Sequence, residues 1–269
     1  MSKDIGNYLD DISFETEVYP GVYWIPLNAL GKTRYTNEQM MDVVQMSFEQ
    51  KKAAISNLYE AVQLFQLSEF KGVMDNADHW VDSIHWQTHK NQEQAVLSNE
   101  GCCATDTNWL AFFIKDHYDF VCSFCYANQD GNGHITTCIQ QDAQYYFIDM
   151  MMCRKDSQNY FCKETGIVTD FMDTEWAGYL YKCRNPVDFC RFNVERFQSK
   201  NRSVPFCFYM RKTDCVTATG CSVDSEKTIF FVPESDHPLV IYGGEGKNKL
   251  QEVKLPESIK RAFVMDGRS

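Results

Sequence analysis

A cysteine, a histidine and an aspartate in the middle of the chain have the types and spacing of a nucleophile, a base and an orienting carboxylate. Cys103 lies at the start of a segment whose apolar residues, from Trp109 to Ile114, predict a helix, with Ser98 and Asn99 as candidate N-terminal caps. The unpaired N–H groups at a helix N-terminus favour negative charge. The pattern therefore predicts a lowered pKa for the Cys103 thiol and a good nucleophile.

His134 and Asp149 follow in a part of the sequence that is rich in strand-forming residues. Short apolar runs are separated by the hairpin signal Asp130-Gly131-Asn132-Gly133, so we expect an antiparallel meander after the helix. His134 opens the strand after the turn and Asp149 ends the next strand, and antiparallel pairing brings such positions together. The sequence predicts a Cys-His-Asp site built on one helix and one sheet.

Three short motifs carry a resemblance to a known family. Gly101-Cys102-Cys103, Gly133-His134 and Tyr146-Phe147-Ile148-Asp149 resemble the Cys, His and Asp boxes of the transglutaminase-like superfamily of papain-type cysteine enzymes. That family has a small residue four positions after its cysteine, and Thr107 stands there in this chain. The resemblance implies an α+β fold with a papain-like transglutaminase core, the catalytic residues Cys103, His134 and Asp149, and no cofactor. It covers only the stretch from Ser98 to Asp149, so it implies no particular substrate.

The chain departs from the family pattern in two places. His134 is followed by Ile135-Thr136, where the family has an aromatic residue soon after its histidine. The doubled cysteine leaves Cys102 as a second candidate nucleophile, although the Gly-x-Cys spacing favours Cys103. Both cysteines could instead be small buried thiols without a catalytic role. Upstream, Gln94 is the candidate side chain for an oxyanion hole beside the backbone N–H of Cys103.

These residues predict thiol-dependent acyl transfer on an amide, with hydrolysis favoured over transamidation and a peptide or protein as the substrate. The alternative function is a non-catalytic transglutaminase-like module that binds a peptide or a partner protein. A metal site is not expected. His85 and His89 are four residues apart, but the glutamate that follows the first histidine of a metalloprotease motif is absent. Cys122-x-x-Cys125 lies on a predicted strand, where residues three apart face opposite sides.

The net charge of −11 argues against binding to nucleic acid or to an anionic membrane surface. No apolar run is long enough to span a bilayer, and the N-terminal sequence has no signal-peptide core. The twelve cysteines are then most simply reduced thiols, which predicts a cytoplasmic protein.

Three regions are expected along the chain. Residues 1–97 form an N-terminal arm and helices packed on the core, and residues 98–155 form the transglutaminase-like catalytic core. Residues 156–269 form a β-rich C-terminal extension, which could be a separate domain or part of the same one. Within the first region a capping box, Thr36-x-x-Gln39, and an apolar stripe predict a single helix over 37–67. Within the last, a helix is expected in 184–202 and strands at 205–210, 228–232 and 239–242.

Overall fold

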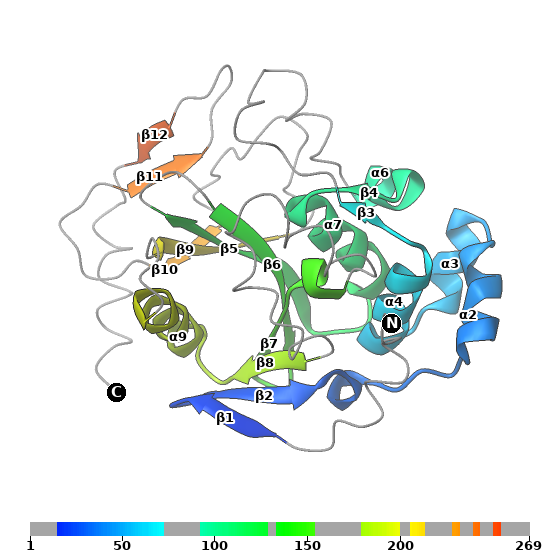
Figure 1. Cartoon of the computed structure of the whole chain (residues 1–269), viewed down its shortest axis with the longest axis horizontal. Helices are drawn as coiled ribbons and strands as arrows, with labels where there is room; N and C mark the ends of the chain where they lie inside the picture. The colour runs from blue at the N-terminus through cyan, green and yellow to red at the C-terminus, as the bar shows by residue number, and fades with distance from the viewer. Residues whose placement is uncertain are drawn as a thin grey trace.

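An antiparallel sheet of eight strands is the framework of the fold (Figure 1). The computed structural model describes residues 15–72, 92–128, 133–153 and 179–199, and the strands at 205–212, 228–231, 239–242 and 250–253. Across the sheet the strand order is β1-β2-β8-β7-β6-β5-β9-β10. In chain order the strands are β1 (Thr16–Tyr19), β2 (Val22–Pro26), β5 (Phe120–Asn128), β6 (Gly133–Gln141), β7 (Gln144–Ile148), β8 (Tyr179–Cys183), β9 (Pro205–Lys212) and β10 (Thr228–Phe231).

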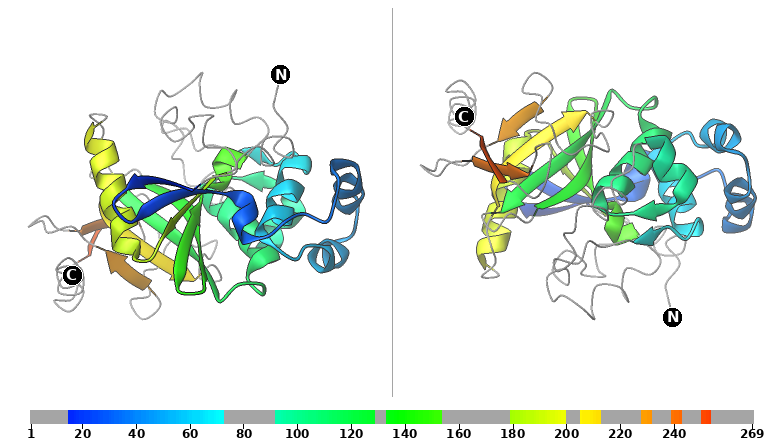
Figure 2. Two further views of the ribbon diagram at one scale, coloured as in Figure 1. Left: turned by 90° about the horizontal axis from the view of Figure 1, so that it is seen from below. Right: turned by 90° about the horizontal axis from the view of Figure 1, so that it is seen from above.

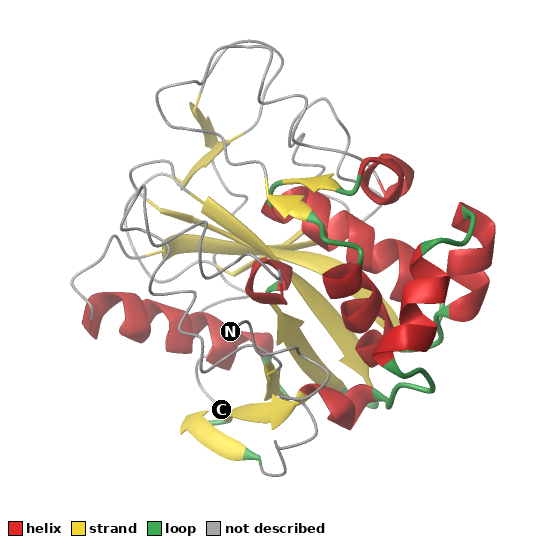
Figure 3. Cartoon of the chain, turned by 45° about the vertical axis from the view of Figure 1, so that its right-hand side comes forward, coloured by secondary structure: helices red, strands yellow, loops and turns green. Residues whose placement is uncertain are grey.

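Helices cover both faces of this sheet. Helix α9 (Pro186–Ser199) lies on one side, and the other helices gather on the opposite side, as two further views show (Figure 2). The helices of the second group, seen at the right of Figure 3, are α2 (Asn37–Val44), α3 (Phe48–Ala54), α4 (Leu58–Leu67), α6 (Gln92–Ser98) and α7 (Cys103–Ile114). The predicted α+β class, with the helix that begins at Cys103 packed on antiparallel strands, is confirmed.

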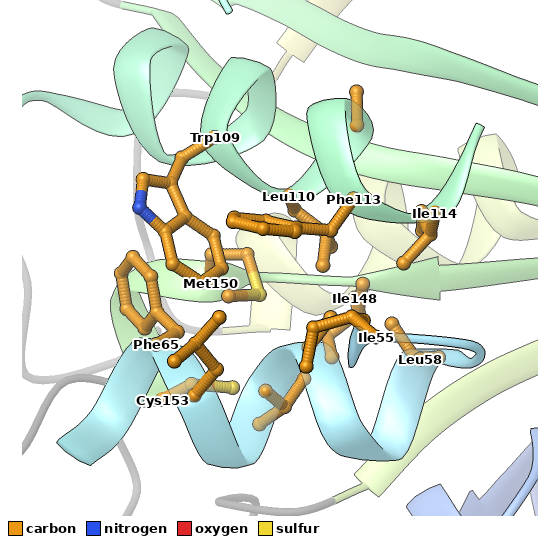
Figure 4. Packing of buried hydrophobic residues seen from close by; sticks show 14 of the residues in the cluster. Ile55, Leu58, Phe65, Trp109, Leu110, Phe113, Ile114, Ile148, Met150 and Cys153 are labelled. Carbon is orange, nitrogen blue, oxygen red and sulfur yellow. The ribbon is translucent and has the colours of Figure 1, made fainter. Parts of the chain in front are cut away.

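The larger apolar cluster joins α7 to α4 and to the sheet (Figure 4). The rings of Trp109 and Phe113 on α7 lie 4.6 Å apart, and Phe65 of α4 meets Trp109 edge-on at 5.0 Å. Every residue of α7 from Ala104 to Ile114 is buried. Because burying each large apolar side chain stabilises the fold by about 2 kcal/mol, this cluster fixes the helix that carries Cys103.

A second apolar cluster lies between α9 and the other face of the sheet. Phe147 of β7 and Phe189 of α9 stack with their ring centroids 3.9 Å apart, and Phe124 of β5 lies 4.9 Å from Phe147. Four buried free cysteines belong to the same cluster, namely Cys122, Cys138, Cys183 and Cys190. Burial raises the pKa of the Cys183 thiol to about 12. These cysteines pack as small apolar side chains.

The single helix expected over residues 37–67 is wrong, because three helices occupy that range. The capping box of Thr36 with Gln39 is confirmed. Ser47 forms a second capping box that starts α3, and the Asn57 side chain accepts from the Glu60 amide at the start of α4. Because the side chains of Ser47 and Asn57 accept hydrogen bonds from backbone N–H groups, each starts a new helix, and the apolar stripe is divided among three helices.

Strands from the first and last thirds of the chain join the central sheet. Strand β2 pairs with β8, which pairs with β7, and β9 pairs with β5. Helix α9 and strands β9, β10 and β11 (Leu239–Tyr242) lie where the sequence predicts a helix and three strands. Strand β11 pairs with β12 (Leu250–Val253) in a separate two-stranded sheet.

Two features expected from the sequence lie outside the described residues. These are the pair His85 and His89 and the centre of the turn at 130–132. Among the helices that the structure describes, none combines the length and the apolar character needed to cross a membrane.

Candidate active site

Helix α7 begins at Cys103, and Cys102 occupies the N-cap position in an extended conformation. The expected caps, Ser98 and Asn99, are therefore wrong. Ser98 ends α6, and Asn99 has a positive φ of 51° where the chain turns into the short strand β4 (Glu100–Gly101). Strand β4 pairs in parallel with β3 (Lys71–Gly72). This short pairing fixes the approach of the backbone to the two cysteines.

Gly101 is required by a close approach between the chain before α7 and the helix itself. Its φ is +157°, and a Cβ placed on it would lie 2.4 Å from the Cβ of Thr105. Thr105 is fully buried, so neither side of this contact has room to move.

Replacing Gly101 with alanine is expected to destabilise the protein by about 1–3 kcal/mol, the usual cost of overpacking. Because the displaced residues lead directly into Cys102 and Cys103, thiol reactivity should change as well. Urea unfolding together with the rate of Cys103 alkylation checks this expectation. Wild-type values for both in Gly101→Ala would contradict the close contact.

His134 and Asp149 form a direct ion pair at the end of the β6–β7 hairpin. His134 is the second residue of β6, and Asp149 directly follows the last residue of β7. The His134 Nε2 to Asp149 Oδ2 distance is 2.6 Å, and the two side chains are only 13% and 16% exposed. The Cys153 thiol donates to the main-chain oxygen of Asp149 at 3.7 Å and so holds the turn after β7.

Cys103 lies beside the start of β6. The backbone N–H of Ile135, the residue after His134, donates a hydrogen bond to the Cys103 sulfur. Helix α7 packs on β6, so this bond joins the helix that begins at Cys103 to the strand that carries His134. Both Cys102 and Cys103 are half-buried. Cys103 thus lies beside the residue that follows His134, and His134 pairs with Asp149, while the catalytic assignment of the three residues stays a prediction.

The pKa of the Cys103 thiol is raised well above its ordinary value. The main cause is a hydrogen bond with the Cys102 thiol, followed by burial, and these outweigh the opposing bond from the Ile135 amide. The lowered pKa expected from the helix N-terminus is therefore wrong. At neutral pH the resting thiol keeps its proton, so nucleophilic chemistry at this sulfur would require a base to remove that proton.

The pKa of His134 is raised. Burial acts to lower it, but the charge and hydrogen bond of Asp149 outweigh burial, and the charge of Asp106 adds to them. With Nε2 donating to Asp149, the lone pair of the neutral ring lies on Nδ1, which is then the nitrogen that accepts a proton.

This raised pKa predicts a pH-dependent contribution to stability. The folded state favours protonated His134, so the contribution is full below about pH 6.5, the unfolded pKa, and is lost as pH rises through the folded pKa. We expect Asp149→Asn to lower the free energy of unfolding more near pH 6 than near pH 9, as measured by urea unfolding. An equal loss at both pH values would contradict the ion pair.

Two further polar residues near Cys103 in the sequence are Gln94 and Asp106. Gln94 lies on α6 with an exposed side chain, so its place in an oxyanion hole stays a prediction. Asp106 of α7 is only 1% exposed, and its charge acts on both Cys103 and His134. The sequence analysis missed it, because an acidic residue in a first helical turn is ordinarily a solvated one. The signal that could have found it is its spacing of three residues from Cys103.

Within the described part of the chain, no group of three or more His, Cys, Asp or Glu residues is placed to hold a metal ion. Cys122 packs in the cluster under α9. Cys125 is three residues further along β5, so strand alternation points it to the opposite face.

Comparisons of the chain with protein-family models, with curated proteins and with solved structures gave no match.

Proposed function

We propose that this chain is a thiol-dependent enzyme that transfers an acyl group from an amide, with hydrolysis as the outcome and a peptide or protein as the substrate. The observation that carries the proposal is the 2.6 Å pair of His134 and Asp149 beside a cysteine at a helix N-terminus. We also propose that α7, β6 and β7 correspond to a papain-like transglutaminase core. The order of helix, strand and strand, with the three residues at their ends, supports this assignment.

In the first half-reaction His134 removes the proton from Cys103 as the sulfur attacks the carbonyl carbon. The C–S bond forms, the amide C–N bond breaks, and protonated His134 gives its proton to the leaving amine. Asp149 holds the ring through Nε2 and stabilises its charged form, which fits the raised pKa of His134. The neutral resting thiol makes this general-base step necessary.

In the second half-reaction a water molecule attacks the thioester. His134 takes a proton from the water, the C–O bond forms, the C–S bond breaks, and the proton returns to the Cys103 sulfur. An amine in place of water would give transamidation, which needs a second binding site. Hydrolysis needs none, and we favour it for that reason.

The test uses p-nitrophenyl acetate, an activated ester that requires no specific binding site. We expect the chain to hydrolyse it, with turnover reduced about 10³-fold in His134→Ala and about tenfold to a hundredfold in Asp149→Ala. The smaller loss is expected for Asp149 because it orients the ring and transfers no proton. Release of p-nitrophenolate is followed by absorbance.

His117→Ala is the matched control. His117 is a second imidazole of the described chain, whose Nε2 lies 3.1 Å from the main-chain oxygen of Ile55. We expect its replacement to leave turnover within about twofold of the wild type. Equal rates for His134→Ala and the wild type would remove the base assignment and favour the non-catalytic binding module.

A further inference from the structure

A second carboxylate, Asp106, is buried near the two cysteines on the same helix turn. It is in the first turn of α7, three residues after Cys103 and four after Cys102, and side chains at these spacings are neighbours on a helix. Its side chain is buried along with the whole residue, which is 1% exposed. Burying a carboxylate is costly, so its place under the reactive residues requires a physical account.

The ionisable groups around Asp106 belong to one small region. The charge of Asp106 acts on Cys103, on His134 and on Cys153 of the 3-10 turn η3 (Met150–Cys153). Asp149 acts on His134 and Cys153 as well, and Cys102 acts on Cys103 and His134. Among the described residues, this region thus holds two carboxylates, one imidazole, the hydrogen-bonded thiols of Cys102 and Cys103, and the thiol of Cys153.

The described acidic residues on the other elements that pack against α7 are either bound by other side chains or at least partly exposed to solvent. Glu60 of α4 is bound by Arg34 and Ser56. Glu93 of α6 is exposed, and Glu100 of β4 is half-buried. On β5 the buried ionisable group of the same face is Cys125. Asp106 is therefore the buried carboxylate placed to set the charge at the N-terminus of α7.

We propose that Asp106 is a positioning residue of the Cys103–His134–Asp149 site, whose buried negative charge adds to the effects of Cys102 and of burial in keeping the proton on Cys103, and stabilises protonated His134 during acyl transfer. A carboxylate in the first turn also occupies the positive end of the helix, which would otherwise stabilise a thiolate. The effect of Asp106 on protonated His134 rests on the proposed function, whereas its effect on the Cys103 proton rests on the site alone.

The test is the pH dependence of Cys103 alkylation by iodoacetamide, measured by peptide mapping. In the wild type we expect the half-maximal rate above about pH 8.5, the ordinary value for a thiol. In Asp106→Asn we expect the midpoint to fall by about one pH unit, which is the size of shift that one nearby charge produces. Asp106→Glu keeps the charge and should keep the wild-type midpoint.

Asp116→Asn is the matched control, because it removes the same charge just past the other end of α7. Asp116 is exposed and pairs with Lys52 at 3.5 Å, so the midpoint should stay at the wild-type value. Should Asp106→Asn fail to fold, Asp106→Ser offers a smaller uncharged side chain for the same measurement. A wild-type midpoint at or below about pH 8.5, or no downward shift in the uncharged variants, would overturn the inference.

The two proposals fail separately. A midpoint that falls in Asp106→Asn while the wild type hydrolyses no p-nitrophenyl acetate would keep the charge role and remove the enzyme. Ester hydrolysis that depends on His134, without any shift in the midpoint, would keep the enzyme and remove the role of Asp106.

Discussion

Cys103→Ala is expected to lower the hydrolysis of p-nitrophenyl acetate by about 10³-fold or more while the fold survives. The Cys103 sulfur accepts from the Ile135 amide next to His134, and its removal takes away the nucleophile that we propose. Alanine fits the site, because Cys103 is half-buried and its loss leaves no large cavity. Ester turnover measures the loss, and circular dichroism with urea unfolding measures the fold.

Cys102→Ala is the paired variant. Cys102 is the N-cap residue and hydrogen-bonds the Cys103 thiol, which raises the pKa of Cys103. Removing it should leave turnover within about tenfold of the wild type. If Cys102→Ala abolishes turnover and Cys103→Ala does not, the nucleophile is Cys102 and the assignment is off by one residue.

Glu60→Gln is expected to lower the free energy of unfolding by about 3 kcal/mol, the largest stability effect predicted for this chain. Glu60 is fully buried at the start of α4. Its two oxygens accept five hydrogen bonds of 2.8–3.1 Å from Arg34 and Ser56. A glutamine has one acceptor oxygen and would turn its NH₂ group toward donors.

The pH dependence of this effect has a definite sign. Burial acts to raise the pKa of Glu60, but the bonds from Arg34 and Ser56 outweigh burial and lower it. The stability from the carboxylate is present above about pH 4.3, the unfolded pKa, and is lost as pH falls through the folded pKa. The gap between wild type and Glu60→Gln in urea unfolding should therefore shrink at low pH.

Glu49→Gln serves as the control for Glu60→Gln. Glu49 is an exposed residue of α3, and its replacement should change the free energy of unfolding by less than about 0.5 kcal/mol. If Glu60→Gln were as mild as this control, the network around Arg34 would contribute little. Helix α4 packs on α7, the helix that begins at Cys103.

The local parts of the site could be predicted from the sequence. The start of a helix at Cys103, the strand that His134 opens and the residue that follows β7 depend on capping, turn and alternation signals within a few residues. The pairing of β5 with β6 and of β6 with β7 could also be predicted, because consecutive strands joined by short turns pair with each other. The resulting contact of His134 with Asp149 is confirmed.

Long-range pairing and charge could not be predicted in the same way. Nothing local indicates that β8 lies between β2 and β7, because that order depends on burying both faces of the completed sheet. The raised pKa of Cys103 also depends on contacts. It arises from the Cys102 thiol and from burial, which a sequence pattern does not contain. Ser47 and Asn57 are residue types that favour helix starts, but the apolar pattern continues across both positions and favours one long helix.

The identity of the residue that carries the acyl group tests the central claim most directly. One equivalent of p-nitrophenyl acetate is mixed with the wild-type chain, the reaction is quenched in acid within one turnover, and the acetylated peptide is identified by mass spectrometry. With Cys103 as the nucleophile and His134 as its base, we expect an acetyl group on Cys103 alone, and no such group in His134→Ala over the same time. Acetylation spread over several cysteines and lysines, or unchanged in His134→Ala, would contradict this assignment.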